Sequence, residues 1–339
     1  MLFSLRIGSL GSNSPSFTVR IPFELAPGRY LNNEQPSEFD LLGAKSTIAI
    51  EDGQYVLIAS DLLSEEAAQI FVQKAGVALI WCGLTQRIGI RYQNEITPIN
   101  IATEPLPIAK DSPFSEIVKF AGWSDFHGDY TTNKTVVVPE HKRLFAFTGG
   151  KPTFRNEIPV QTFAKSIQDG IAEIGSTALA PKLQLACEVY LSSFFENSPA
   201  ASFLSRITTL EILADAPASD RVRQKVEKFI EETKASLHTE KSEAGQQDYQ
   251  SLIGSLAYLR NRSIKGGIRS LFKEVFSGEL GINPATELGR EVAKLYDLRS
   301  DMVHRGVTDH DLVQTAANRL AEITPKLLLL LLKGSSYRP

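Results

Sequence analysis

Two residues that suit acid–base chemistry and phosphate binding, His304 and Arg299, lie five positions apart near the end of an expected helix. Apolar residues recur there at spacings of three and four, which predicts a helix over about 286–305: Leu288, Val292, Leu295, Leu298 and Met302. Gly306 predicts the end of this helix. His304 therefore lies in the last turn, beside the negative end of the helix dipole. This position favours the protonated imidazole, which can act as an acid as well as a base.

The spacing of these two residues also constrains how they can meet. Five residues correspond to roughly 140° around an ideal helix. The side chains of Arg299 and His304 converge only if the last turn is distorted or if a second copy of the motif faces the first. This geometry indicates a dimer. After Gly306, the stretch Thr308-Asp309-His310-Asp311 predicts a capping box that opens the next helix.

The motif Tyr296-x-x-Arg299-Ser300-x-x-Val303-His304-x-Gly306 resembles the Arg-x4-6-His signature of HEPN domains, in particular the ApeA-like and abortive-infection branch. The polar residue after the arginine and the trailing glycine also fit that signature. Further segments that are similar to this branch are 180–190, 203–211 and 256–272. The likeness covers roughly residues 160 to 335. In the family, the arginine and histidine form a metal-independent ribonuclease site, usually assembled across a dimer of helical bundles.

The resemblance implies a role for each residue of the pair, and it implies neither a metal nor a cofactor. His304 would take the proton of a ribose 2′-OH as general base, or protonate the leaving oxygen as acid. Arg299 would hold the scissile phosphate and stabilise the charge of the transition state. The structural alternatives are that His304 caps the free carbonyls of the helix end and that Arg299 pairs with Glu211 or Asp297.

Three further residues are expected to support this site. Ser300 either positions the phosphate or the neighbouring arginine, or it faces solvent. Tyr296 is expected in a core or an interface rather than in chemistry. Glu211 interrupts an apolar helix face that consists of Ile207, Leu210 and Leu213. It is either a buried partner that orients Arg299 or an ordinary exposed glutamate.

The most basic local segment lies upstream of the motif and consists of Arg260, Arg262, Lys265, Arg269 and Lys273, with Tyr258 and Phe272 interleaved. Such a segment could bind RNA phosphates and stack a base. The alternative is a solvated helix face.

Composition limits the class of protein. The chain has 339 residues, a net charge of −3 and a pI of about 6.0, which excludes a broad basic surface for nucleic acid. Cys82 and Cys187 are expected to be buried free thiols, as in a reducing cytosol. The N-terminus lacks the pattern of a signal peptide, and the apolar run 327–332 is too short to span a bilayer. We therefore expect a soluble, cytoplasmic protein without a membrane segment.

The sequence predicts a protein of the α+β class with two domains. Residues 1–150 read as a mixed module, with strands near 3–7, 17–23 and 88–92, a hairpin over 46–59 and a helix over 64–79. Residues 155–335 read as an all-α bundle similar to HEPN domains. Its helices are expected at about 160–175, 180–196, 200–214, 219–237, 246–260, 268–277, 286–305 and 309–333.

Other chemistries have weaker patterns. The residues around the turn, His304, Asp309, His310 and Asp311, fit no standard zinc spacing. The loop residues Asp125, His127 and Asp129 read as a polar surface. Cys82 has no histidine placed near it that would activate a thiol nucleophile. The chain has no phosphate loop and no Gly-x-Gly-x-x-Gly motif, which argues against an NTPase.

The residues and the resemblance together predict a metal-independent RNA endonuclease of the HEPN type, in prokaryotic defence by abortive infection or as a toxin-like effector. Its expected partners are an RNA substrate, a second copy of the chain and a regulatory partner or phage trigger sensed by the N-terminal module. The alternative is a non-catalytic HEPN bundle that binds nucleotides or serves as an interaction scaffold.

Overall fold

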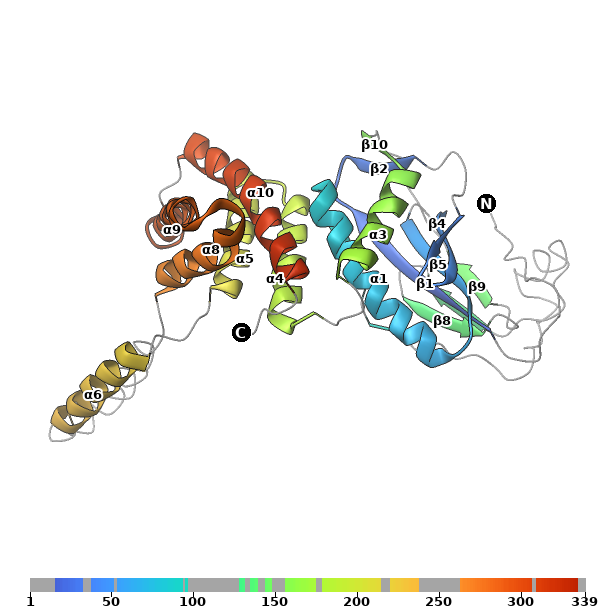
Figure 1. Ribbon diagram of the computed structural model, residues 1–339. Helices are drawn as coiled ribbons and strands as arrows, with labels where there is room; N and C mark the ends of the chain where they lie inside the picture. The colour runs from blue at the N-terminus through green and yellow to red at the C-terminus, as the bar shows by residue number, and fades with distance from the viewer. Residues whose placement is uncertain are drawn as a thin grey trace, which may run out of the picture. The chain divides into compact units, whose positions relative to one another are not determined.

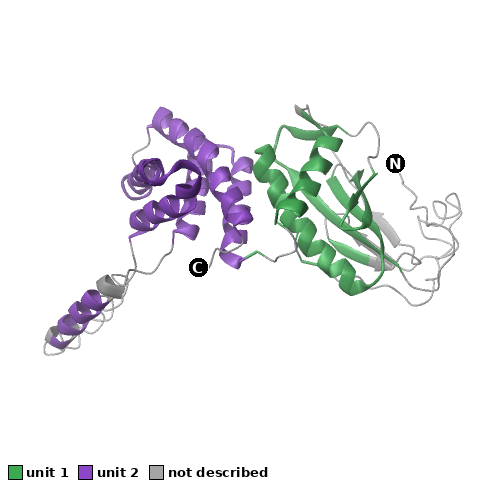
Figure 2. Ribbon diagram, in the orientation of Figure 1, with its two compact units in different colours: residues 1–179 green, residues 180–339 purple. Residues whose placement is uncertain are grey.

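A computed structural model describes a chain of the predicted α+β class, with a mainly antiparallel sheet and a set of long helices (Figure 1). The described residues are 16–32, 38–51, 54–93, 95–96, 128–131, 135–139, 144–147, 156–174, 179–214, 220–237, 263–306 and 309–334. The chain divides into two compact units, Met1–Leu179 and Ala180–Pro339 (Figure 2).

The first unit is built on a sheet with the strand order β3-β4-β5-β1-β6, in which β8 also pairs with β1. These strands are β1 (Phe17–Leu25), β3 (Glu38–Leu41), β4 (Ala44–Glu51), β5 (Gln54–Leu62), β6 (Ile90–Tyr92) and β8 (Val136–Pro139). All of their pairings are antiparallel. Two short parallel pairs are formed by β2 (Arg29–Asn32) with β10 (Asn156–Pro159) and by β7 (Gly128–Thr131) with β9 (Leu144–Phe147).

Two helices, α1 (Glu65–Gln86) and α3 (Val160–Ile174), cover one face of this sheet (Figure 1). The hydroxyl of Ser64 accepts a hydrogen bond from the backbone N–H of Ala67 at 3.0 Å and caps α1. The rings of Phe23 and Phe163 stack at 5.4 Å between β1 and α3. Apolar side chains of the sheet and of both helices thus form one continuous core.

Helix α3 shows that the boundary between the units lies later than the predicted 150–155. It packs along α1 within the first unit and not in the helical bundle. The two helices approach so closely that a Cβ on Gly170 would lie 2.9 Å from the side chain of Trp81. The helical period of residues 160–174 was correctly predicted, but periodicity does not reveal which core an amphipathic helix covers.

Most predicted elements of the first unit are confirmed, with different ends. The predicted hairpin is β4–β5, and Ser64 begins α1 as expected. Helix α1 continues to Gln86, seven residues beyond its predicted end, and the strand predicted at 88–92 begins at Ile90. The strand predicted near residues 3–7 and the loop with Asp125 and His127 lie outside the described residues.

Helix α1 is the one described helix that is long and apolar enough to cross a membrane by length and composition. Its most apolar window is 67% buried inside the structure, which is the burial of a core helix. The predicted location in the cytoplasm stays a prediction.

The second unit consists of helices in its described residues. They are α4 (Pro181–Ser192), a 3-10 turn (Ser193–Phe195), α5 (Pro199–Leu213), α6 (Asp220–Leu237), α8 (Ile264–Leu280), α9 (Ile282–Arg305) and α10 (His310–Lys333). Each corresponds to a predicted helix, and the helix predicted at 246–260 lies outside the described residues. The bundle core is formed by apolar side chains of α4, α5, α8, α9 and α10.

Helices α8 and α9 form an antiparallel hairpin joined by a single residue, Gly281, at φ 84°. A side chain is strained at this φ, and Gly281 allows one helix to end and the next to begin without a loop. The hairpin is fixed to α10 by Arg319, whose guanidinium contacts both carboxylate oxygens of Glu291 at 2.6 and 3.1 Å.

Helix α10 contains Pro325 in its interior. Because proline has no N–H, the carbonyl of Ala321, four residues earlier, has no donor within the helix. The buried Tyr190 on α4 supplies one, with its hydroxyl 3.3 Å from that carbonyl oxygen. The buried Arg206 on α5 donates to the carbonyl of Ala317 at 2.8 Å, so α10 is held from two helices at successive turns.

We expect Tyr190→Phe to lower the free energy of unfolding of the bundle by about 1 kcal/mol, because the part-buried carbonyl of Ala321 then loses the hydrogen bond from Tyr190. Urea unfolding followed by circular dichroism measures this change. An unchanged midpoint would show that Tyr190 contributes packing alone.

Candidate functional site

The residues of the motif lie where three helix ends meet within the second unit. The last turn of α5 carries Glu211, the first turn of α8 carries Lys265, and the last two turns of α9 carry Arg299 and His304. Helices α5 and α8 touch through their backbones here, since a Cβ on Gly267 would lie 2.0 Å from the carbonyl oxygen of Ala214.

Arg299 is half-buried between two side chains. Its Nε lies 3.1 Å from Oε1 of Glu211, and its guanidinium carbon lies 5.8 Å from the centre of the Tyr296 ring. The contact with Glu211 is an ion pair by distance, although Oε1 has no aligned hydrogen-bond donor among the described residues. The side chains of Arg299 and Glu211 are 25% and 17% exposed. The arginine is thus held in place but still reaches solvent.

This pairing was predicted as one of two alternatives for Glu211, a buried partner of Arg299. Burial raises the pKa of the Glu211 carboxyl, and the charge of Arg299 opposes that rise. Burial also raises the pKa of the Tyr296 phenol, and the charge of Glu211 adds to the rise. The charge of Arg299 thus favours the ionised form of Glu211 against the effect of burial.

We expect Arg299→Ala to lower the stability of the bundle by about 1–3 kcal/mol at neutral pH, because it leaves the Glu211 carboxylate half-buried without a cation. The folded-state pKa of Glu211 lies above its unfolded value, so the cost of ionising it appears as the pH rises past about 4. The loss should therefore be larger at pH ~7 than at pH ~4.

Urea unfolding at both pH values measures this loss, and the double variant Glu211→Gln with Arg299→Ala is the matched control. The double variant should recover most of the stability at neutral pH. An equal loss at the two pH values would contradict a role of Arg299 as the counter-ion of Glu211.

Two more ion pairs surround the motif. The ammonium group of Lys265 lies 2.8 Å from both carboxylate oxygens of Asp297 and ties α8 to α9. Arg305 lies 3.3 Å from Asp301, one helical turn earlier on α9. Asp297 was predicted as a possible partner of Arg299, and the structure pairs it with Lys265 instead.

His304 is exposed in the last turn of α9. The helix is α-helical through Arg305 and ends at Gly306, which has a left-handed φ of 64° as expected for this helix stop. A distorted last turn, one of the two ways in which the sequence allowed Arg299 and His304 to converge, is therefore absent from α9. In one chain, the side chains of Arg299 and His304 point about 140° apart around the axis.

The next helix begins one residue later than the capping pattern predicted. The carboxylate of Asp309 caps α10 by accepting hydrogen bonds from the backbone N–H groups of Asp311 and Leu312, each at 3.1 Å. Asp309 satisfies two free N–H donors at the start of the helix. The N-cap is therefore Asp309, one residue after Thr308, the first residue of the predicted capping box.

Of the other predicted site residues, some lie near Arg299 and others do not. Ser300 is half-buried on α9 beside Arg299. Arg269 is exposed on α8, one turn from Lys265, while Arg260 and Arg262 lie outside the described residues. The prediction that Phe272 stacks a base is wrong, because its ring is fully buried against Phe276.

The rival thiol site is contradicted by burial. The thiols of Cys82 and Cys187 are free and buried, as expected. Burial raises the pKa of the Cys82 thiol to about 12 and raises that of Cys187 as well. Such thiols are not nucleophiles. Among the described residues, no three His, Cys, Asp or Glu side chains gather as metal ligands.

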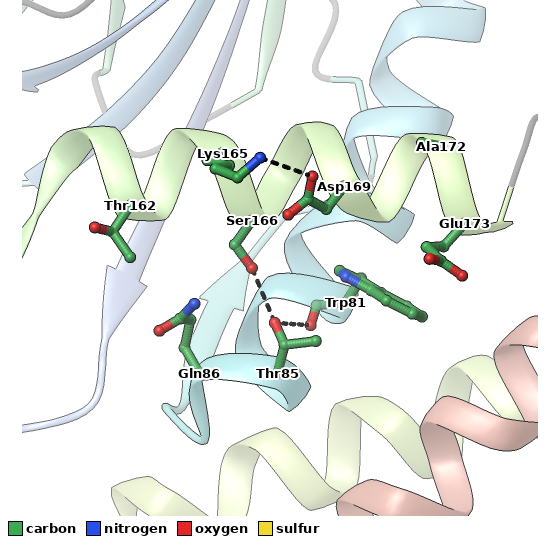
Figure 3. A pocket seen from close by; sticks show the side chains of 9 residues that line it. All are labelled: Trp81, Thr85, Gln86, Thr162, Lys165, Ser166, Asp169, Ala172 and Glu173. Atoms are coloured by element: carbon green, nitrogen blue, oxygen red, sulfur yellow. Dashed lines mark hydrogen bonds and ion pairs between the residues drawn. The ribbon is translucent and has the colours of Figure 1, made fainter.

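A pocket of about 580 Å³ between α1 and α3 was not predicted from the sequence (Figure 3). It is lined by Trp81, Thr85, Gln86, Thr162, Lys165, Ser166, Asp169, Ala172 and Glu173. Four of its polar side chains are paired with each other: the hydroxyls of Thr85 and Ser166 are 2.9 Å apart, and Lys165 lies 3.6 Å from Asp169. No convergent set of charges points to a ligand class.

No family model, no curated protein and no solved structure matches the chain. The resemblance to HEPN domains therefore rests on the residues of the chain itself.

Proposed function

We propose that this protein is a metal-independent RNA endonuclease of the HEPN type, acting as a homodimer in antiviral defence or as a toxin-like effector. The observation that carries the proposal is the position of Arg299 and His304. They lie five residues apart in the last turns of α9, with His304 exposed and a quarter of the Arg299 side chain open to solvent. Both catalytic groups can thus be reached by a phosphodiester.

In this proposal the chemistry is carried by side chains. The imidazole of His304 takes the proton of a ribose 2′-OH, and the 2′-oxygen attacks the adjacent phosphorus. The bond from phosphorus to the 5′-oxygen breaks, and the leaving oxygen receives a proton from an imidazolium. The guanidinium of Arg299 stabilises the added negative charge in the transition state. The products are a 2′,3′-cyclic phosphate and a 5′-hydroxyl end.

A second copy of the chain completes the site. Because α9 is regular through Arg305, Arg299 and His304 of one chain point apart. In a symmetric dimer, Arg299 of one chain faces His304 of the other, and the same contact occurs twice. The first unit then senses a trigger or restrains the nuclease.

RNA cleavage in EDTA by the full chain tests the proposal. We expect products with 2′,3′-cyclic phosphate and 5′-hydroxyl ends, which can be identified by their resistance to direct 3′-end ligation and by direct 5′-end phosphorylation. Products with 5′-phosphate ends would contradict attack by the 2′-OH.

One observation favours the second candidate, a non-catalytic HEPN-like scaffold. Arg299 forms an ion pair with Glu211 across two helices, which is the structural alternative for this residue. In a scaffold, His304 would be dispensable and Arg299 would serve stability alone. Cleavage of equal rate in the natural chain and in His304→Ala would come from a contaminant or from another site, and it would count against the nuclease and leave the scaffold as the better candidate.

A further inference from the structure

The arginines at the end of α9 are both occupied by carboxylates of the same chain. Arg299 pairs with Glu211 and Arg305 with Asp301, while the neighbouring Lys265 pairs with Asp297. Within the described residues of this helix end, these cations and carboxylates balance. An RNA phosphate that approaches the motif therefore meets an array of ion pairs and not a positive patch.

The three pairs differ in how firmly the carboxylate is held. Asp297 and Asp301 are 54% and 46% exposed, and water and salt weaken the attraction in such exposed pairs. Glu211 is 17% exposed and belongs to α5, across the helix interface from Arg299. Its attraction to the guanidinium is screened least, so it competes most strongly with an incoming anion.

Oε1 of Glu211 has no aligned hydrogen-bond donor among the described residues, so the carboxylate competes with a phosphate for the charge of Arg299 and not for its N–H donors. The guanidinium carries a single charge, which Glu211 already offsets before any substrate arrives. A phosphate bound at Arg299 must displace the carboxylate or share the guanidinium with it at close range, and two anions at such a distance repel each other.

We propose that Glu211 is an internal competitor of the substrate phosphate, which occupies Arg299 in the resting protein and weakens the binding of phosphodiesters there. The ligand class is a phosphate oxyanion of a nucleic acid backbone. The inference rests on the proposed function for the identity of the ligand, but its test is binding and does not require cleavage. If Glu211 instead only orients Arg299 for the phosphate, removing its charge should weaken the binding of phosphodiesters and not strengthen it.

The test is the affinity of the full chain for a fluorescent 2′-O-methyl oligoribonucleotide of mixed sequence, which lacks the 2′-OH needed for cleavage. Fluorescence anisotropy at about 50 mM salt gives the Kd. We expect Glu211→Gln, which keeps the shape of the side chain and removes its charge, to bind about tenfold more tightly than the natural protein. The gain should disappear when Arg299→Gln is added to Glu211→Gln.

Asp301→Asn is the matched control, since it removes one carboxylate from an exposed pair on the same helix. It should change the Kd by less than about twofold. An equal gain in Asp301→Asn and Glu211→Gln would overturn the proposal in favour of a general charge effect. Unchanged or weaker binding by Glu211→Gln would overturn it in favour of the orienting role. An absence of binding by both proteins would overturn it as well, because no phosphate would then bind at Arg299.

Circular dichroism and the unfolding midpoint establish that the Glu211→Gln variant is folded. If that variant fails to fold, Glu211→Asp provides the second test, because it keeps the charge and withdraws the carboxylate by one methylene. We expect an intermediate gain in affinity from it, and unchanged or weaker binding would overturn the proposal. If the natural protein does not cleave RNA, the proposed nuclease is contradicted. The change in Kd caused by Glu211→Gln still tests the present proposal, because it is measured by binding alone.

Discussion

His304→Ala is expected to lower the rate of RNA cleavage in EDTA by about 10²–10⁴-fold, the usual contribution of a general acid or base. Histidine is the usual side chain for general acid–base catalysis, and His304 is the one histidine of α9. His304 is exposed and lies at a helix end, so its truncation removes little packing. The rate is measured on full-length chains with equal unfolding midpoints.

The control for this result separates a composite site from a site within one chain. We would mix His304→Ala with the double variant Glu211→Gln and Arg299→Gln, which avoids an unpaired Glu211. If Arg299 of one chain acts with His304 of the other, mixed dimers contain one intact site, and about a quarter of the activity should return. No recovery in dimers shown to exchange subunits would contradict the composite site.

The choice of His304 over Arg299 as the diagnostic residue follows from the ion pair. Removing Arg299 leaves Glu211 half-buried without its cation, so a loss of activity in Arg299→Ala combines chemistry with stability. Sequence alone gives both residues equal weight as catalytic candidates. The structure shows that only His304 can be changed without disturbing a contact between helices.

The helices themselves were largely predictable, because their signals are local. Ser64 and Gly306 mark the start of α1 and the end of α9 through capping chemistry that depends on a few neighbours. The pairing of Glu211 with Arg299 was also within reach, since a glutamate that interrupts an apolar face needs a partner. The pairing of Lys265 with Asp297 was not, because it depends on the register of two helices.

The least predictable feature was the length of α8. The sequence predicted a helix over 268–277, while the structure extends it from Ile264 to Leu280. Glycine reduces helix propensity, and Gly266, Gly267 and Gly278 lie just outside the predicted range. Tertiary packing overrides this preference at Gly267, where the absence of a side chain lets α8 touch the end of α5.

Gly267→Ala is therefore expected to lower the free energy of unfolding of the bundle by about 3 kcal/mol. The added Cβ would lie 2.0 Å from the carbonyl oxygen of Ala214, and a backbone atom cannot rotate away as a side chain can. Helix α8 would have to move away from α5, which carries Glu211 only three residues before the contact. The variant should be less stable, as measured by urea unfolding. The relative positions of Glu211 and Arg299 should also change, which can be measured as a change in binding of the 2′-O-methyl oligonucleotide.

Gly278→Ala supplies the matched control, because it makes the same change in the same helix where a Cβ meets nothing within 4 Å. Alanine favours a helix over glycine by roughly 1 kcal/mol, so this variant should be as stable as the natural protein or slightly more stable. The contrast between the two variants isolates the contact at Ala214 from helix propensity. If both variants were equally stable, the approach of α8 to α5 would not determine the arrangement of the helix ends that hold Arg299 and Glu211.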